Sequence, residues 1–249
     1  MKKPTVSQEG LKLIASLTML IDHIGAVLVY AIYHSAWNAG NYTLSNAMAA
    51  LYEPMRIIGR IAFPIYCFLL VEGFHHTRNV KNYIARLGIG MLLSEIPFDL
   101  AFSGRMDWES SSVMVTLLLG CLMMQCIQRL GGIWKLAVIL PFVQIAEWLG
   151  TDYGGNGIAL IAMLALTKGL PKEKLWRSAG FVILLWFGPD VQVGSLNIPM
   201  ELFALIGLVP MFLYEGKKLT QSKWVQWTFY LFYPVHLLIL WILERMFIS

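Results

Sequence analysis

Asp22 and His23 lie next to each other in the stretch TMLIDHIGA, at the centre of an apolar segment that covers residues 11–33. Ionisable side chains at the middle of a bilayer are costly and usually have a function. A histidine titrates near neutral pH and is a common general base, although a histidine and an aspartate at this depth also suit proton-coupled transport. The plainer alternative is a neutral His23 that hydrogen-bonds a neighbouring helix.

Three further ionisable residues lie in apolar stretches: Arg60 in GRIAFPI, Glu95 in LLSEIPFDL and His236 in FYPVHLL. Arg60 and Glu95 lie at comparable depths in the outer half of their segments, so we expect them to form an ion pair. Arg56, one turn away from Arg60, is expected to reach the outer headgroups by itself. His236 follows Pro234, and it could instead bond the carbonyl that this proline leaves free.

A second polar group lies where an apolar segment ends, in VEGFHHTRNVK. Glu72, His75 and His76 are three and four residues apart and share one face of a helix. Two histidines and a carboxylate at this spacing permit a zinc site, but no water-activating motif surrounds them. A solvated face next to Arg78 and Lys81 is therefore the favoured interpretation, and we expect no metal.

The elements that carry these residues are membrane helices. The chain of 249 residues is 57% hydrophobic and 14% charged, with a mean hydropathy of +0.63, whereas about a quarter of a soluble domain is charged. We predict an all-α, polytopic helix bundle with a single domain over residues 1–249, in which the longest polar connection is 34–55. Nine spans are expected, at about 11–33, 56–74, 82–102, 112–128, 133–149, 155–168, 175–189, 197–214 and 225–247.

The basic residues predict the orientation of these spans. Five segments contain 15 of the 19 Lys and Arg residues, and the connections between them contain almost none. The positive-inside rule therefore predicts a cytoplasmic N-terminus, an outer C-terminus and a multi-pass protein of the bacterial cytoplasmic membrane. Cys67, Cys121 and Cys126 match no metal-ligand spacing and are expected to be apolar filling residues. We expect no nucleic-acid partner.

Known catalytic motifs of other classes are missing, since the chain contains no Walker loop, no GxSxG elbow and no dinucleotide-binding fingerprint. Four stretches instead resemble the TraX family, named for the conjugative-pilin acetylase. These stretches are LKLIASLTMLIDHIGAVL, RIIGRIAFPIYCFLLVEGFHHTRNVKNYIARL, LLSEIPFDLAF and FYLFYPVHLLIL. They cover the first two-fifths of the chain and its last span, whereas residues 104–195 are much less diagnostic.

This resemblance implies a membrane-embedded acyltransferase. Its namesake is associated with acetylation of a pilin N-terminus, and the broader transmembrane acyltransferases pass acetyl groups from cytosolic acetyl-CoA to acceptors at or beyond the outer face. The acceptor is left open as a peptide amine, a sugar or a small molecule. The alternatives are a proton-coupled small-molecule transporter and a non-catalytic assembly factor for a surface appendage.

The resemblance also gives the polar residues expected roles. His23 or His236 would be the general base, and Asp22 could anchor another helix, through Arg60 or His236. Arg60 would stabilise the developing oxyanion or bind donor phosphate, and Glu95 would be its partner. The basic cytoplasmic segments would hold the phosphates of coenzyme A, and the candidate donor-binding residues are Glu72, His75, His76, Arg78 and Lys81.

Overall fold

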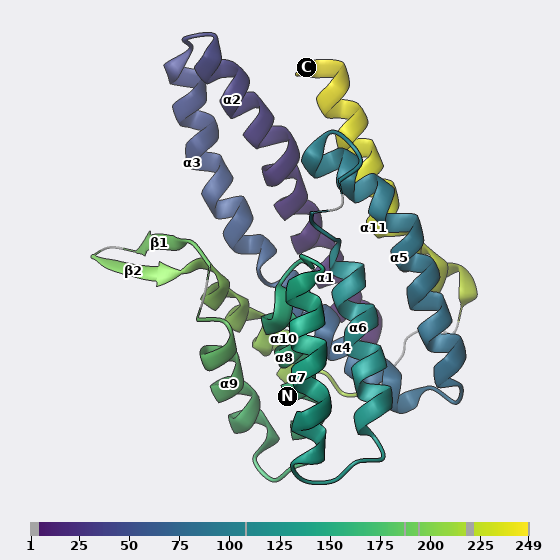
Figure 1. Ribbon diagram of the computed structural model, residues 1–249. Helices are drawn as coiled ribbons and strands as arrows, with labels where there is room; N and C mark the ends of the chain where they lie inside the picture. The colour runs from purple at the N-terminus through teal and green to yellow at the C-terminus, as the bar shows by residue number, and fades with distance from the viewer. Residues whose placement is uncertain (1–4, 108, 187, 194, 218–221, 249) are drawn as a thin grey trace.

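The computed structural model describes residues 5–107, 109–186, 188–193, 195–217 and 222–248. It is nearly all helical, which confirms the predicted fold class (Figure 1). Each of the nine predicted spans overlaps a helical segment, but the span 56–74 crosses a break between two helices and the span 197–214 begins in a strand. The one sheet in the described residues is a two-stranded antiparallel hairpin of β1 (Asp190–Val193) and β2 (Leu196–Pro199).

The N-terminal part is a long helical hairpin. Its first arm is continuous and consists of α1 (Gln8–Ile24), the π-helix η1 (Gly25–Val29) and α2 (Tyr30–Asn38). Its second arm is α3 (Tyr42–Gly59), which packs on all three parts of the first arm. Figure 1 shows α2 and α3 projecting together beyond the neighbouring helices.

Helix α3 corrects the sequence prediction, which placed a polar connection at residues 34–55. The Asn41 side chain begins the helix by accepting a hydrogen bond from the backbone N–H of Leu44 at 3.1 Å, as N-cap residues do. Polar residues such as Glu53 hid the helix from a search for apolar runs, because only one face of α3 packs on the first arm.

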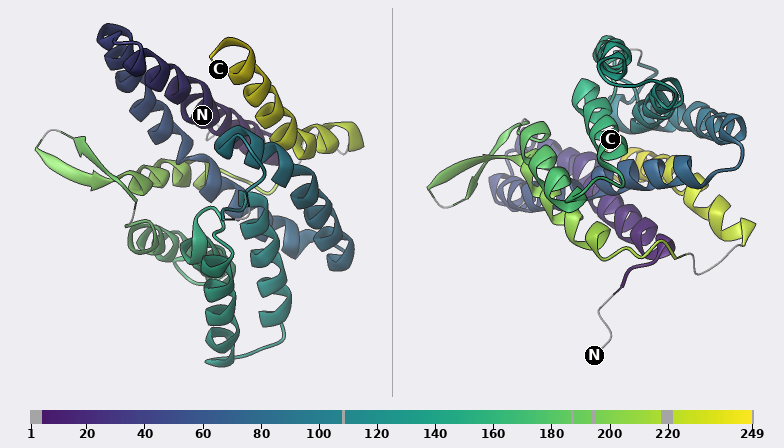
Figure 2. Two further views of the ribbon diagram at one scale, coloured as in Figure 1. Left: turned by 45° about the horizontal axis from the view of Figure 1, so that its top comes forward. Right: turned by 90° about the horizontal axis from the view of Figure 1, so that it is seen from below.

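The core surrounds α4 (Ala62–His76), whose side chains are buried along most of its length. A helix that is apolar on all sides is one that neighbours cover completely. Helices α1, α6 and α8 pack against α4, and α5 pairs with α11 along the opposite side of the molecule (Figures 1 and 2). The remaining elements are α5 (Val80–Ser103), α6 (Val113–Ile127), α7 (Trp134–Trp148), α8 (Gly154–Thr167), α9 (Glu173–Leu184), the 3-10 helix η2 (Met200–Gly207), α10 (Leu208–Phe212) and α11 (Lys223–Phe247).

Within the described parts of the chain, three helices are long and apolar enough to cross a membrane, by length and composition: Gln8–Asn38, Tyr42–His76 and Trp227–Phe247. Shorter apolar helices occupy Val113–Ile127, Gly154–Thr167 and Met200–Phe212. These lengths support a membrane protein, and the predicted count of nine crossings stays a prediction. The first two long segments each exceed 30 residues, which is more than the roughly 20 that a bilayer needs.

The basic segments meet at one end of the fold. Lys168 after α8 pairs with Glu72 near the end of α4 at 2.5 Å, and Lys174 of α9 donates to the carbonyl of Phe212. The N-terminal Val6 bonds the carbonyl of Leu213 at 2.9 Å. Residues 2–4 and 218–221 of these basic segments lie outside the described residues. The end of α11 lies away from this basic end (Figure 1).

Candidate functional site

Asp22 and His23 are buried near the end of α1, directly before the π-helix η1. Their side chains contact different helices: Asp22 binds two arginines, at residues 56 and 60, and His23 binds His236 of α11. The expected separation of neighbouring side chains on a helix explains this divergence. The sequence left Arg60 and His236 as possible partners of Asp22, and in the structure Asp22 binds Arg60. Single-turn π segments inside α-helices are frequent at functional sites.

Asp22 belongs to a buried network of two acids and two arginines. Its Oδ2 accepts from Arg56 Nη1 at 2.8 Å, and its Oδ1 accepts from Arg60 Nη2 at 3.0 Å. Arg60 Nη1 donates to Oε1 of Glu201 on η2 at 2.6 Å. Charge-assisted hydrogen bonds of this kind compensate buried charges that would otherwise be very costly. The network therefore joins α1, α3 and η2.

One prediction about the arginines is wrong. Arg60 does not pair with Glu95, because its Nε donates to the Arg56 carbonyl and its two terminal nitrogens bind Asp22 and Glu201. Arg56 binds Asp22, and its contact with the outer headgroups stays a prediction. The sequence placed Arg60 and Glu95 at similar depths, but depth does not say on which side of the bundle a residue lies.

Gly59 allows the close approach between α1 and α3. A Cβ atom at this position would overlap the Asp22 carboxylate. Tyr153 lies beneath the network, where its ring stacks on Phe63 at 3.7 Å and faces the Arg60 guanidinium at 6.0 Å. Tyr153 also adopts a left-handed backbone conformation with φ of 66°, which is uncommon for a residue other than glycine and often marks a functional position.

The two histidines form a directed hydrogen-bond chain. His23 Nδ1 lies 2.6 Å from His236 Nε2, and His236 Nδ1 lies 2.6 Å from the carbonyl oxygen of Phe232. The ring planes differ by 10° and the centroids are 4.9 Å apart, which is the N–N distance plus the two ring radii. The rings therefore lie edge to edge in nearly one plane, the geometry of an in-plane N–H···N bond.

This chain determines where the protons lie. A carbonyl oxygen only accepts, so Nδ1 of His236 must carry a hydrogen. Nε2 of a neutral His236 is then an acceptor, and Nδ1 of His23 must donate to it. The assignment leaves the lone pair on His23 Nε2. One alternative from the sequence is thereby wrong: the Phe232 carbonyl is not the one that Pro234 leaves free, because a helical N–H at 234 would bond residue 230.

Glu95 lies in a separate polar group. Its Oε1 accepts a very short hydrogen bond from the Ser112 hydroxyl and a second bond, of 3.3 Å, from the Ser112 backbone N–H. The ring of Tyr233 lies 5.9 Å from the ring of His23. Glu95 is thus bound to Ser112 and not to Arg60.

The predicted donor-binding residues lie at the basic end, apart from these two groups. His75 Nδ1 donates to the carbonyl of Val71, and His76 Nδ1 donates to the carbonyl of Glu72, each at 2.8 Å. Both histidines therefore bond the carbonyl four residues earlier in their own helix. The Glu72 carboxylate pairs with Lys168, and both Arg78 and Lys81 are exposed. No group of three metal-ligating side chains occurs among the described residues.

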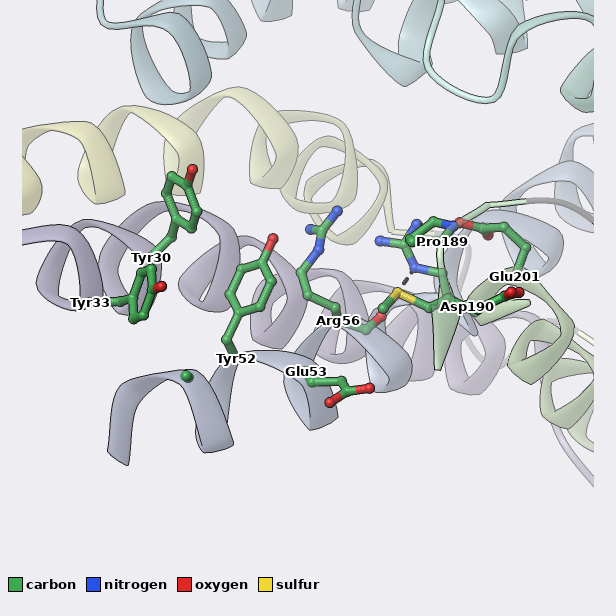
Figure 3. A pocket seen from close by; sticks show the side chains of 11 residues that line it. Tyr30, Tyr33, Tyr52, Glu53, Arg56, Pro189, Asp190 and Glu201 are labelled. Atoms are coloured by element: carbon green, nitrogen blue, oxygen red, sulfur yellow. Dashed lines mark hydrogen bonds and ion pairs between the residues drawn. The ribbon is translucent and has the colours of Figure 1, made fainter. Parts of the chain in front are cut away.

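A pocket of about 540 Å³ opens beside the buried network (Figure 3). Its walls come from α2, α3, β1 and η2, and they include Tyr30, Tyr33, Tyr52, Arg56 and Glu201. The sequence analysis missed Glu201, although it is the one acid in the predicted span 197–214. The rule that singled out His23, that an ionisable residue in an apolar span has a function, applies equally to Glu201.

Comparison with known proteins gives two matches. The sequence profile of a family described as TraX protein matches residues 7–244. The chain is also 30% identical over 250 residues to a probable fimbrial assembly protein, FimC of serogroup H1, from Dichelobacter nodosus; the match covers 92% of this chain and 92% of that protein. No solved structure matches the chain.

Proposed function

Because the chain belongs to the TraX family, we propose that it is a membrane-embedded acetyltransferase of the bacterial cytoplasmic membrane. It moves an acetyl group from cytosolic acetyl-CoA to an amine or hydroxyl acceptor at or beyond the outer face. The observation that carries this proposal is the hydrogen-bond chain from Phe232 through His236 to His23, which leaves Nε2 of His23 unprotonated. A buried imidazole with a defined basic nitrogen is suited to general-base catalysis.

The proposed reaction transfers one acetyl group and one proton. The acceptor nitrogen or oxygen bonds to the acetyl carbonyl carbon and gives its proton to His23 Nε2. The carbon–sulfur bond breaks, and the coenzyme A thiolate takes up the proton that His23 releases. His236 stabilises the imidazolium that forms on His23, because its Nε2 accepts the hydrogen bond from His23 Nδ1. His236 is thus a positioning residue.

The arginines have different roles in this proposal. Three of the five N–H groups of Arg60 already bind Arg56, Asp22 and Glu201, so Arg60 mainly holds the network together. Arg56 makes one side-chain ion pair, with Asp22, and also lines the pocket. Of the two, Arg56 has more donors free to stabilise negative charge that develops on a substrate oxygen.

The donor is proposed to enter from the basic end. Arg78 and Lys81 follow the end of α4, whose 15 residues span about 22 Å. Coenzyme A carries its thioester at the end of a long flexible arm, so its phosphates can remain at this surface while the acetyl group reaches the level of His23. Exposed cations can bind phosphate oxygens without a preformed cavity.

The test is coenzyme A release by purified protein in vesicles that contain acetyl-CoA and a membrane fraction as the source of acceptor. His23→Ala should still bind coenzyme A. It should convert acetyl-CoA to free coenzyme A at least a hundredfold more slowly, because loss of a general base usually lowers the rate by this much. The matched control is His34→Ala, which removes an exposed histidine from α2. Normal turnover by His23→Ala would overturn the proposal, as would proton-dependent uptake of a solute by wild-type protein without coenzyme A release.

A second candidate is a non-catalytic assembly factor, because the Dichelobacter nodosus relative is described as a probable fimbrial assembly protein. The two functions differ in what His23 does. An assembly factor would support formation of a surface appendage equally well with His23→Ala, provided that the variant folds. If the protein is an acetyltransferase, cells that carry His23→Ala should contain acceptor that has not been acetylated.

A further inference from the structure

The tyrosine-lined end of the pocket lies at the depth of the outer phospholipid headgroups, and the pocket extends inward from there to Arg56, Arg60 and Glu201 of the ion-pair network. Tyr30 follows Gln8, the first residue of the long N-terminal helix, by 22 positions, or about 33 Å of helix. The hydrocarbon core of a bilayer is roughly 30 Å thick. With the basic end at the cytoplasmic surface, Tyr30, Tyr33 and Tyr52 therefore lie where aromatic residues usually meet the outer headgroups.

The pocket offers binding groups of both charges. On the cationic side, Arg56 uses one of its terminal nitrogens to bind Asp22 and has further N–H groups available. On the anionic side, Glu53 and Asp190 line the pocket, and no ion pair joins either of them to another described residue. Figure 3 shows Arg56 and Glu53 on the same helix, with Asp190 and Glu201 at the adjoining end of the pocket.

Glu201 supplies an independent indication of a ligand. It is 5% exposed, and its Oε1 binds Arg60. Its other oxygen, Oε2, is buried and has no hydrogen-bond partner among the described residues. A buried carboxylate oxygen without a donor is costly, and a ligand N–H group in the pocket would satisfy it.

We propose that this pocket binds the headgroup of an outer-leaflet phosphatidylethanolamine. The phosphate receives hydrogen bonds from Arg56 and from the tyrosine hydroxyls. The primary ammonium donates to Glu201 Oε2 and lies near Glu53 and Asp190. A volume of about 540 Å³ is in the range of small-molecule sites. Binding of this lipid is a separate property from the proposed acetyl transfer and does not depend on it.

The charge pattern favours a zwitterion over other ligands. An anionic lipid would place its phosphate near Arg56 but would leave Glu53 and Asp190 without a cation and Glu201 Oε2 without a donor. A peptide amine would satisfy the acids but would leave the free donors of Arg56 without an anion. The three methyl groups on a choline headgroup remove every N–H that Glu201 Oε2 requires.

The experiment measures lipid binding by native mass spectrometry of delipidated protein, without any acyl donor. Dilauroyl phosphatidylethanolamine, phosphatidylcholine and phosphatidylglycerol are each titrated at the same concentrations. Phosphatidylethanolamine should bind roughly tenfold more tightly than the other two, because one charge-assisted contact is worth about that factor. The variant Glu53→Gln combined with Asp190→Asn should lose this preference. Glu215→Gln, which changes an exposed acid at the basic end, should retain it.

Equal binding of the three lipids by wild-type protein would overturn the proposal. So would an unchanged preference in the double variant, since Glu53 and Asp190 supply the anionic wall. A short peptide with a free N-terminus is added as a competitor, with its N-acetylated form as the control. If the free peptide displaces phosphatidylethanolamine and the acetylated form does not, the pocket is a peptide site and the lipid assignment is wrong.

Discussion

At the scale of single residues, the central feature is that adjacent side chains serve different parts of the site. Asp22 and its arginines fix the position of α1 against α3 and η2. His23 completes a hydrogen-bond chain that starts at a backbone carbonyl of α11. A rigid ion-pair network next to a histidine of defined tautomer holds the proposed base in one orientation, as catalytic groups require.

The role of His236 can be tested by its effect on turnover. His236→Ala should lower the rate of coenzyme A release by roughly tenfold or more, because His23 loses the acceptor that fixes its tautomer. His236→Gln should restore part of the rate, since its amide can accept from His23 and donate to Phe232. The KM for acetyl-CoA should stay unchanged in both variants. Equal rates for the two variants, or a changed KM with a normal kcat, would contradict a positioning role.

The sequence identified most of the ionisable residues of the site, but it did not predict which of them bind one another. His23, His236, Asp22 and Arg60 stand out because each is ionisable within an apolar run. Glu201 has the same signature. Whether Arg60 pairs with Glu95 or with Glu201 depends on which helices adjoin α3, and hydropathy carries no information about that choice.

At the scale of elements, the contact between α1 and α3 decides the shape of the site. Gly59 lets α3 approach until the Asp22 carboxylate occupies the space of a side chain. The π-helix η1 follows the end of α1, and α2 beyond it contributes Tyr30 and Tyr33 to the pocket. The site therefore depends on a close helix pair.

Substitution of Gly59 should weaken this contact. Gly59→Ala should destabilise the protein by about 1–3 kcal/mol, because the new methyl group must displace the Asp22 carboxylate. Gly88→Ala is the matched control, since a Cβ at this position in α5 meets nothing within 4 Å and alanine favours a helix. Thermal unfolding of both variants in one detergent measures the difference. If the thermal unfolding midpoint of Gly59→Ala equals or exceeds that of Gly88→Ala, α3 can move to accommodate the methyl group and the prediction is wrong.

At the scale of the whole molecule, the basic segments that the sequence separates meet at one end of the fold. An ion pair connects the ends of α4 and α8, and hydrogen bonds connect the end of α10 with α9 and with the N-terminal segment. The free end of α11 and the α2–α3 projection lie away from this end (Figure 1). A single basic surface facing the cytoplasm is what the positive-inside rule predicts for this arrangement.

Single cysteines can establish the orientation in the membrane. In a background with the exposed Cys126 replaced by serine, Glu215→Cys should react with a membrane-impermeant maleimide only after the cells are opened. Arg105→Cys, in the exposed turn after α5, should react in intact cells. Labelling of both positions from the same side would rule out the predicted topology.

The sequence by itself determined that this chain is a helical membrane protein and which residues are candidates for chemistry. Long apolar runs specify helices because a bilayer leaves no other way to satisfy the backbone, and isolated charges within them are conspicuous for the same reason. The tertiary structure decided the rest. It replaced the expected Arg60–Glu95 pair by a network with Asp22 and Glu201, revealed α3, and gave His23 its tautomer through His236. These features depend on contacts between helices far apart in the chain, and a hydropathy pattern records how apolar each helix is but not which neighbour it meets.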